Sequence, residues 1–150
     1  MADGSDVLLK FYDVDWSHVT QSENQRTAFS NIVILIASAV FGFLSQHGLT
    51  RDALPLTVLL IALGLYGGIA SEKLYERSKL HMELAWAWRR RLYELHPDIQ
   101  LGRLIKEAEE INRKRFPRLF RLHLHHVWLA LDLSIALAGI IMTVVIVFTR

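Results

Sequence analysis

The hydrophobic positions of this chain gather into three long runs instead of alternating with polar positions. The runs cover residues 27–50, 53–71 and 122–149, and the only Asp, Glu, Lys or Arg inside them is Asp132. A bilayer core about 30 Å thick is crossed by about 20 apolar residues of helix, so each run is long enough. Neither of the first two runs has the polar face that is typical of a soluble core helix. The sequence therefore predicts an all-α membrane protein with three transmembrane helices, at about 29–46, 53–71 and 126–148.

Between the second and third runs the pattern changes to that of amphipathic helices. No Gly or Pro interrupts residues 72–96, so we expect the second transmembrane helix to continue through them until Pro97 ends it. Asp98 is then the expected N-cap of a helix over 99–116, and the two helices are predicted to form a cytoplasmic antiparallel hairpin. Residues 5–27 predict a further amphipathic cytoplasmic helix. The apolar stripes of the hairpin contain Leu74, Ala85, Trp88, Leu92 and Leu95 in the first helix, and Leu101, Leu104, Ile105, Ala108, Ile111 and Phe116 in the second.

Positive charge is concentrated in the same region and predicts the topology. The net charge is only +2, but 13 of the 17 Lys and Arg residues lie between Lys73 and Arg121. Cytoplasmic loops carry the excess of Lys and Arg, so this segment and the N-terminus are expected in the cytoplasm and the C-terminus outside. Residues 1–150 form one helical membrane domain in this interpretation. The cytoplasmic basic patch consists of Arg89, Arg90, Arg91, Arg113, Lys114, Arg115, Arg118 and Arg121.

Beyond setting the topology, the basic patch is suited to anionic ligands. Its residues just before the third span favour anionic membrane lipid as a partner. Binding of nucleic acid stays open. The absence of cysteine excludes disulfides and Cys-based metal sites. The first residues carry two Asp before the first Lys, which is not typical of a cleavable signal peptide.

Asp132 is the first candidate functional residue. An ionisable group inside a membrane span costs a few kcal/mol unless it faces protein or water. Two interpretations stay open. Asp132 forms a hydrogen-bonded structural cluster with Asn31, Tyr66 and Ser134, or these residues line a polar pore or a proton path.

Small residues within the spans predict close helix packing. Three spans bury little surface by themselves, so we expect a homo-oligomer in addition to packing within the chain. The predicted packing residues are Ser38, Ala39, Gly42, Gly64, Gly67, Gly68, Ala136 and Gly139.

Other chemistry finds little support, and we expect no enzyme, no metal and no cofactor. His123, His125 and His126 do not all share one helical face, and no neighbouring Asp, Glu or Cys completes a tetrahedral metal site. Arg91 and His96 match the R-x4-H pattern of HEPN-type ribonucleases, but other Arg and His pairs in this chain match it too. No phosphate-binding loop, catalytic triad or dinucleotide motif is present.

The arrangement resembles the SLATT-type small membrane proteins of bacterial nucleotide-signalling and anti-phage systems. The resemblance covers about residues 25–97: the spans NIVILIASAVFGFLSQHG and LPLTVLLIALGLYGGIAS, followed at once by EKLYERSKLHMELAWAWRRRLYELHPD. It implies an oligomeric effector in the bacterial inner membrane that permeabilises or depolarises that membrane. The alternative is a non-conducting scaffold whose basic hairpin recruits a cytoplasmic protein or nucleic acid.

Overall fold

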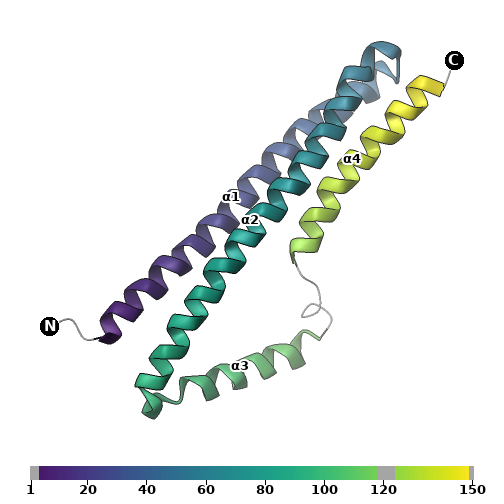
Figure 1. Cartoon of the computed structure of the whole chain (residues 1–150). Helices are drawn as coiled ribbons and strands as arrows, with labels where there is room; N and C mark the ends of the chain where they lie inside the picture. Colours follow the sequence, from purple (N-terminus) through teal and green to yellow (C-terminus); the bar gives the residue numbers. More distant parts are fainter. Residues whose placement is uncertain (1–3, 118–123, 149–150) are drawn as a thin grey trace. The chain divides into compact units, whose positions relative to one another are not determined.

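A computed structural model describes residues 4–117 and 124–148 of the chain. Over these residues the chain is built from four helices and two short 3₁₀ turns (Figure 1). In chain order they are α1 (Gly4–His47), η1 (Arg51–Ala53), α2 (Leu54–Leu95), η2 (Pro97–Ile99), α3 (Leu101–Arg115) and α4 (Leu124–Phe148).

The helices divide between two compact units, which are considered separately below. The polar unit comprises Met1–Glu23 and Glu76–His123, and the apolar unit comprises Asn24–Tyr75 and Leu124–Arg150. The helices α1 and α2 are each divided between the two units, with one segment in each. α3 belongs to the polar unit and α4 to the apolar unit.

The ends of the helices follow from local sequence signals. α1 ends before Gly48, which adopts a left-handed φ of 77° and donates its N–H to the Leu44 carbonyl at 2.9 Å. Pro55 lies in the first turn of α2, where its missing N–H breaks no helical hydrogen bond. α2 ends at Leu95, as predicted from Pro97.

Two expectations about the helices need correction. The predicted helices at 5–27 and 29–46 are one continuous helix of 44 residues, because no Gly or Pro occurs between residues 5 and 41. Asp98 is not the N-cap of α3. It lies in η2, and the N-cap is Gln100, which has a left-handed φ of 49° and forms no side-chain cap.

Five of the buried positions of α2 recur every seven residues, as in coiled coils. Thr57, Gly64, Ser71, Ser78 and Ala85 are all buried, and every one of them has a small side chain. Small side chains at a packed seam let a neighbouring helix approach closely. The hydrophobic core of the apolar unit consists of Val33, Ala37, Val40, Leu44, Ala53, Leu60, Ile135 and Ile146.

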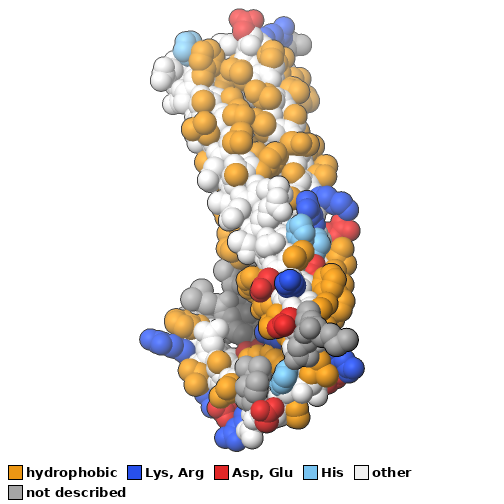
Figure 2. Space-filling view, turned by 90° about the vertical axis from the view of Figure 1, so that its left-hand side faces the viewer, with side chains coloured by type: hydrophobic (Ala, Val, Ile, Leu, Met, Phe, Trp, Pro, Cys, Tyr) orange, Lys and Arg blue, Asp and Glu red, His pale blue; other side chains and the backbone are white. Residues whose placement is uncertain are grey.

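Each of α1, α2 and α4 contains a segment long and apolar enough to cross a membrane, in agreement with the three predicted spans. The surface of the apolar unit is suited to contact with the hydrocarbon chains of lipid. Figure 2 shows its upper part covered by hydrophobic side chains, with charged groups near the ends. Large apolar residues such as Leu35 and Ile69 are more than 70% exposed, at 72% and 71%. In water such a surface would drive aggregation, whereas lipid chains solvate it.

In the polar unit, α3 leaves much of its predicted apolar stripe uncovered. Leu104, Ile111 and Phe116 are 56%, 65% and 43% exposed, whereas Ile105 is half-buried. The amphipathic sequence of α3 is therefore present, but the burial expected of a closed hairpin is not found at these three positions.

Candidate functional site

In the apolar unit, α2 and α4 approach until their backbones touch. A Cβ atom added at Gly64 would lie 2.5 Å from the backbone N of Ala136 and from the backbone O of Asp132. One added at Gly139 would lie 2.9 Å from the Ile61 N. Three of the predicted packing residues, Gly64, Ala136 and Gly139, therefore form this contact. Gly68 has a looser environment, since its added Cβ would lie 3.5 Å from the nearest side-chain atom.

Asp132 is enclosed by the same contact. Its exposed fraction is 2%, and an added Cβ at Gly67 would lie 2.7 Å from its Oδ1 atom. The carboxylate thus occupies the space left by the absent side chain of Gly67. No described residue hydrogen-bonds its Oδ2 atom. Asp132 therefore lies in the packed interior of the described chain, between α2 and α4.

The structure does not bring the three proposed partners of Asp132 to it. Tyr66 is 61% exposed and packs edge-on against Phe29, with ring centroids 5.3 Å apart. Ser134 is exposed and donates to the Leu131 carbonyl at 2.7 Å. Asn31 is exposed on α1. Among the described residues the predicted hydrogen-bonded cluster is not formed, because similar depth along the helices does not place these side chains on facing sides.

A stripe of exposed residues with three polar side chains lies on the outside of α1. Asn31, Leu35, Ser38, Gly42 and Ser45 recur at intervals of three and four residues, and all are exposed. At 100° per residue they lie nearly opposite the buried stripe of the same helix. A Cβ added at Gly42 would meet no atom within 4 Å. Ser38, Ala39 and Gly42, predicted as packing residues, are exposed and so form no part of the buried interface. We refer to these five residues as the outer α1 face.

The outer surfaces of the other two spans carry fewer polar groups. On α2 the exposed residues of the span are hydrocarbon apart from Tyr66. On α4 they are hydrocarbon apart from His126, at the start of the span, and Ser134. The spaced series of one amide and two hydroxyl groups is found on α1.

The polar unit contains a buried carboxylate that the sequence reading did not single out. Asp15 is 8% exposed and accepts hydrogen bonds from His81 Nδ1 at 2.9 Å and from Trp88 Nε1 at 2.7 Å. The His18 ring stacks on His81 with centroids 4.6 Å apart. Burial acts to raise the pKa of Asp15, but the hydrogen bonds from His81 and Trp88 and the nearby histidine charges outweigh it and lower the pKa.

A second unforeseen contact lies in the apolar unit near the start of α4. His125 Nε2 is 3.0 Å from a Glu72 carboxylate oxygen, and the His125 ring stacks on Tyr75 with centroids 4.0 Å apart. His123 lies outside the described residues. Within the part of the chain that the structure describes, no group of three or more His, Asp or Glu side chains could hold a metal ion.

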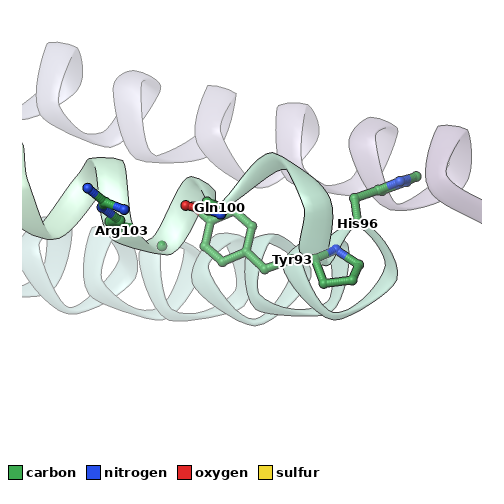
Figure 3. Close-up of a pocket in the computed structure, with 6 residues that line it drawn as sticks. Tyr93, His96, Gln100 and Arg103 are labelled. Carbon is green, nitrogen blue, oxygen red and sulfur yellow. The ribbon is translucent and has the colours of Figure 1, made fainter.

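Two adjoining hollows lie where α2 turns into α3. The first, of about 370 Å³, is lined by Tyr93, His96, Pro97, Gln100, Gly102 and Arg103. Figure 3 shows Tyr93, Gln100 and Arg103 along this hollow, whereas the His96 ring points away from them. The second hollow, of about 260 Å³, shares Tyr93 and Gly102 with the first and adds Trp86, Arg89, Arg90, Ile105, Lys106 and Glu109.

The predicted basic patch is divided by these hollows. Arg89 and Arg90 line the second hollow, but Arg91 forms an ion pair with Glu94 at 2.6 Å. The His96 ring hydrogen-bonds Ser5 at 2.9 Å, so the R-x4-H pair is directed to separate partners.

The remainder of the patch follows at the end of α3. Lys114 lies 4.0 Å from Glu110, and the Arg115 guanidinium is 5.6 Å from the Phe116 ring. Arg113 is exposed. Arg118 and Arg121 lie outside the described residues.

No family model matches this chain, and neither a curated protein nor a solved structure does.

Proposed function

We propose that this protein assembles from several copies of itself in a bacterial inner membrane and permeabilises that membrane. The observation that carries the proposal is the outer α1 face, which presents Asn31, Ser38 and Ser45 along one side of a span. This face and not Asp132 is the surface that we assign to the pore or to its protomer contacts.

The argument rests on what the outer α1 face would meet in lipid. A side-chain amide without a hydrogen-bond partner in hydrocarbon costs about 2–7 kcal/mol. Contact with the same face of another copy, or with water in a pore between copies, removes that cost. Ser38 and Gly42 also allow close approach, because neither carries a bulky side chain.

The positive-inside rule supplies the orientation in this proposal. The N-terminus and the polar unit lie in the cytoplasm, and the C-terminus lies outside. The cytoplasmic part then receives the trigger, in keeping with the defence role that the SLATT resemblance implies.

The test compares two leucine variants in liposomes that contain a trapped ion-sensitive dye. Asn31→Leu combined with Ser38→Leu removes the polar groups of the outer α1 face and should reduce ion flux at least tenfold. Ser134→Leu is the matched control, because this exposed serine lies on α4 and its hydroxyl bonds only its own helix among described residues. Flux through the control should equal that of the unchanged protein.

Mass measurement in nanodiscs accompanies the flux assay. We expect an assembly of several chains for the unchanged protein. A monomer that still conducts, or equal flux from both leucine variants, would refute the assignment of the outer α1 face.

The exposed stripe of α3 favours a second function, that of a non-conducting scaffold. Leu104 and Ile111 are exposed, and the last turn of α3 carries Arg113, Lys114 and Arg115. A scaffold would cause no flux in liposomes and would co-purify from cells with a protein or nucleic acid. Leu104→Ser with Ile111→Ser should release that partner, whereas Ser134→Leu should retain it.

A further inference from the structure

The hollow between the last turns of α2 and the first turns of α3 is lined by two matching helix faces. α2 contributes Trp86, Arg89, Arg90 and Tyr93, and α3 contributes Gly102, Ile105, Lys106 and Glu109, each at positions i, i+3, i+4 and i+7. In a closed helical hairpin these are the positions that pack against each other. Here three of the eight are cations, and a space of about 260 Å³ separates the helices.

The cations of this hollow are not neutralised within the described protein. The Arg89 guanidinium lies 4.6 Å from the Trp86 ring centroid and 5.8 Å from that of Tyr93, so aromatic rings and not a carboxylate hold it. No ion pair joins Arg90 or Lys106 to a described carboxylate, in contrast to Arg91, which is paired with Glu94. Glu109 offsets one of the three positive charges that line the space.

We propose that this hollow binds a phosphate-bearing anion. Arg89, Arg90 and Lys106 would contact the phosphate oxygens, since guanidinium and ammonium groups form strong charge-assisted hydrogen bonds with phosphate. A bound anion would also relieve the repulsion between cations on the two facing helices.

The adjoining hollow sets the size of the ligand. It shares Tyr93 and Gly102 with the hollow lined by the three cations and extends to Gln100 and Arg103, with a further volume of about 370 Å³ (Figure 3). The two hollows together have room for a molecule larger than inorganic phosphate, with one end at the cations. A soluble organic phosphate and a phospholipid headgroup share this chemistry. The site does not depend on whether the protein conducts ions.

Adjacent arginines provide a matched pair of variants. R90Q with K106Q removes two charges that line the hollow. R91Q with K114Q removes two charges that pair with Glu94 and Glu110 away from it. All four side chains lie on the surface, so circular dichroism should show unchanged helix content in both variants.

Native mass spectrometry of the full chain in neutral detergent then counts bound probes. Inorganic pyrophosphate represents the soluble source, phosphatidylglycerol represents the lipid source, and phosphatidylcholine is the uncharged control. Binding of one of the two anionic probes should fall at least tenfold in R90Q/K106Q and less than twofold in R91Q/K114Q. The anionic probe that shows this pattern identifies the source. Equal weakening in the two variants, or no binding of either anionic probe to the unchanged protein, would overturn the proposal.

Discussion

Gly64 and Gly68 lie one turn apart on α2, yet a methyl group added at each would meet different surroundings. At Gly64 it would lie 2.5 Å from two backbone atoms of α4, whereas at Gly68 it would lie 3.5 Å from a leucine methyl group. Gly64→Ala and Gly68→Ala therefore make the same chemical change on the same helix, with only the first obstructed.

The magnitude follows from the overlap at Gly64. Restoring an ordinary contact of about 3.5 Å requires α2 and α4 to separate locally by about 1 Å. The obstructing atoms are backbone, so no rotamer change can relieve them. A gap of about 0.5–1 Å forfeits a quarter to a half of the dispersion energy of the atoms involved. Overpacking of this kind costs about 1–3 kcal/mol.

Helix propensity acts in the opposite direction but cancels in the comparison. Alanine is better than glycine in a helix by about 0.8–1.0 kcal/mol, and both variants make that gain. The difference in the free energy of unfolding between the two variants should therefore equal the steric cost, about 1–3 kcal/mol.

Two assays measure this difference. Unfolding of the full chain by SDS in mixed micelles, followed by circular dichroism, gives the free energy of unfolding of each variant. A disulfide assay gives the proximity of α2 and α4 directly, since the chain has no cysteine of its own. The hydroxyl oxygens of Thr57 and Thr143 are 2.9 Å apart, so cysteines at both positions should cross-link rapidly.

We expect Gly64→Ala to slow this cross-linking and Gly68→Ala to leave it unchanged. Equal stability and equal cross-linking of the two variants would refute the close approach of α2 and α4 at Gly64.

Three further predictions concern buried polar groups. The lowered pKa of Asp15 stabilises the fold at neutral pH, and this contribution should be lost as pH falls below about 4 and through the folded pKa. Thermal unfolding measured over a series of pH values tests this. Asp15→Asn should remove the loss of stability at low pH, whereas Asp13→Asn, at an exposed position, should not. Valine at Thr57 and Thr143, singly and together, should give a coupling energy of about 0.6 kcal/mol in a double-mutant cycle, and zero coupling would contradict the hydroxyl contact. Asp132→Asn keeps the shape that fits against Gly67, so it should fold and leave liposome flux unchanged. A large change in flux would contradict the proposed assignment of the flux path to the outer α1 face.

The extent of α2 could be predicted because its signals are local. The absence of Gly and Pro after residue 71 and the presence of Pro97 determine where the helix continues and where it ends. The same absence of helix breakers over residues 5–41 predicts the continuous α1 helix. The change from polar to apolar residues within α1 suggests a boundary between two helices, but helix continuity does not depend on that change.

The pairing of side chains could not be read from local signals. Asp15 and His81 are separated by 66 residues, and their contact depends on the register of two long helices. The 4-3 spacing that joins Asp15 to the buried Val19 and Ser22 could have shown that this carboxylate lies on the packed side of α1. Small residues in the spans could be recognised as a set, but only the three-dimensional arrangement separates Gly64, which is used in packing, from Gly42, which is not.

The apolar and polar segments of α2 pack against their neighbours in different ways, because lipid surrounds the first and water the second. Within lipid, burying an apolar side chain gains little over leaving it in hydrocarbon, so association depends on close packing and hydrogen bonds. Gly64 and Thr57 supply these in the apolar unit. In the polar unit water is the solvent, and the buried Asp15 accepts hydrogen bonds from His81 and Trp88. A shift of one turn between α1 and α2 would separate these groups and leave a buried carboxylate without its donors. A wrong register is therefore costly in the polar unit, whereas in the apolar unit close approach and the Thr57–Thr143 contact hold α2 against α4.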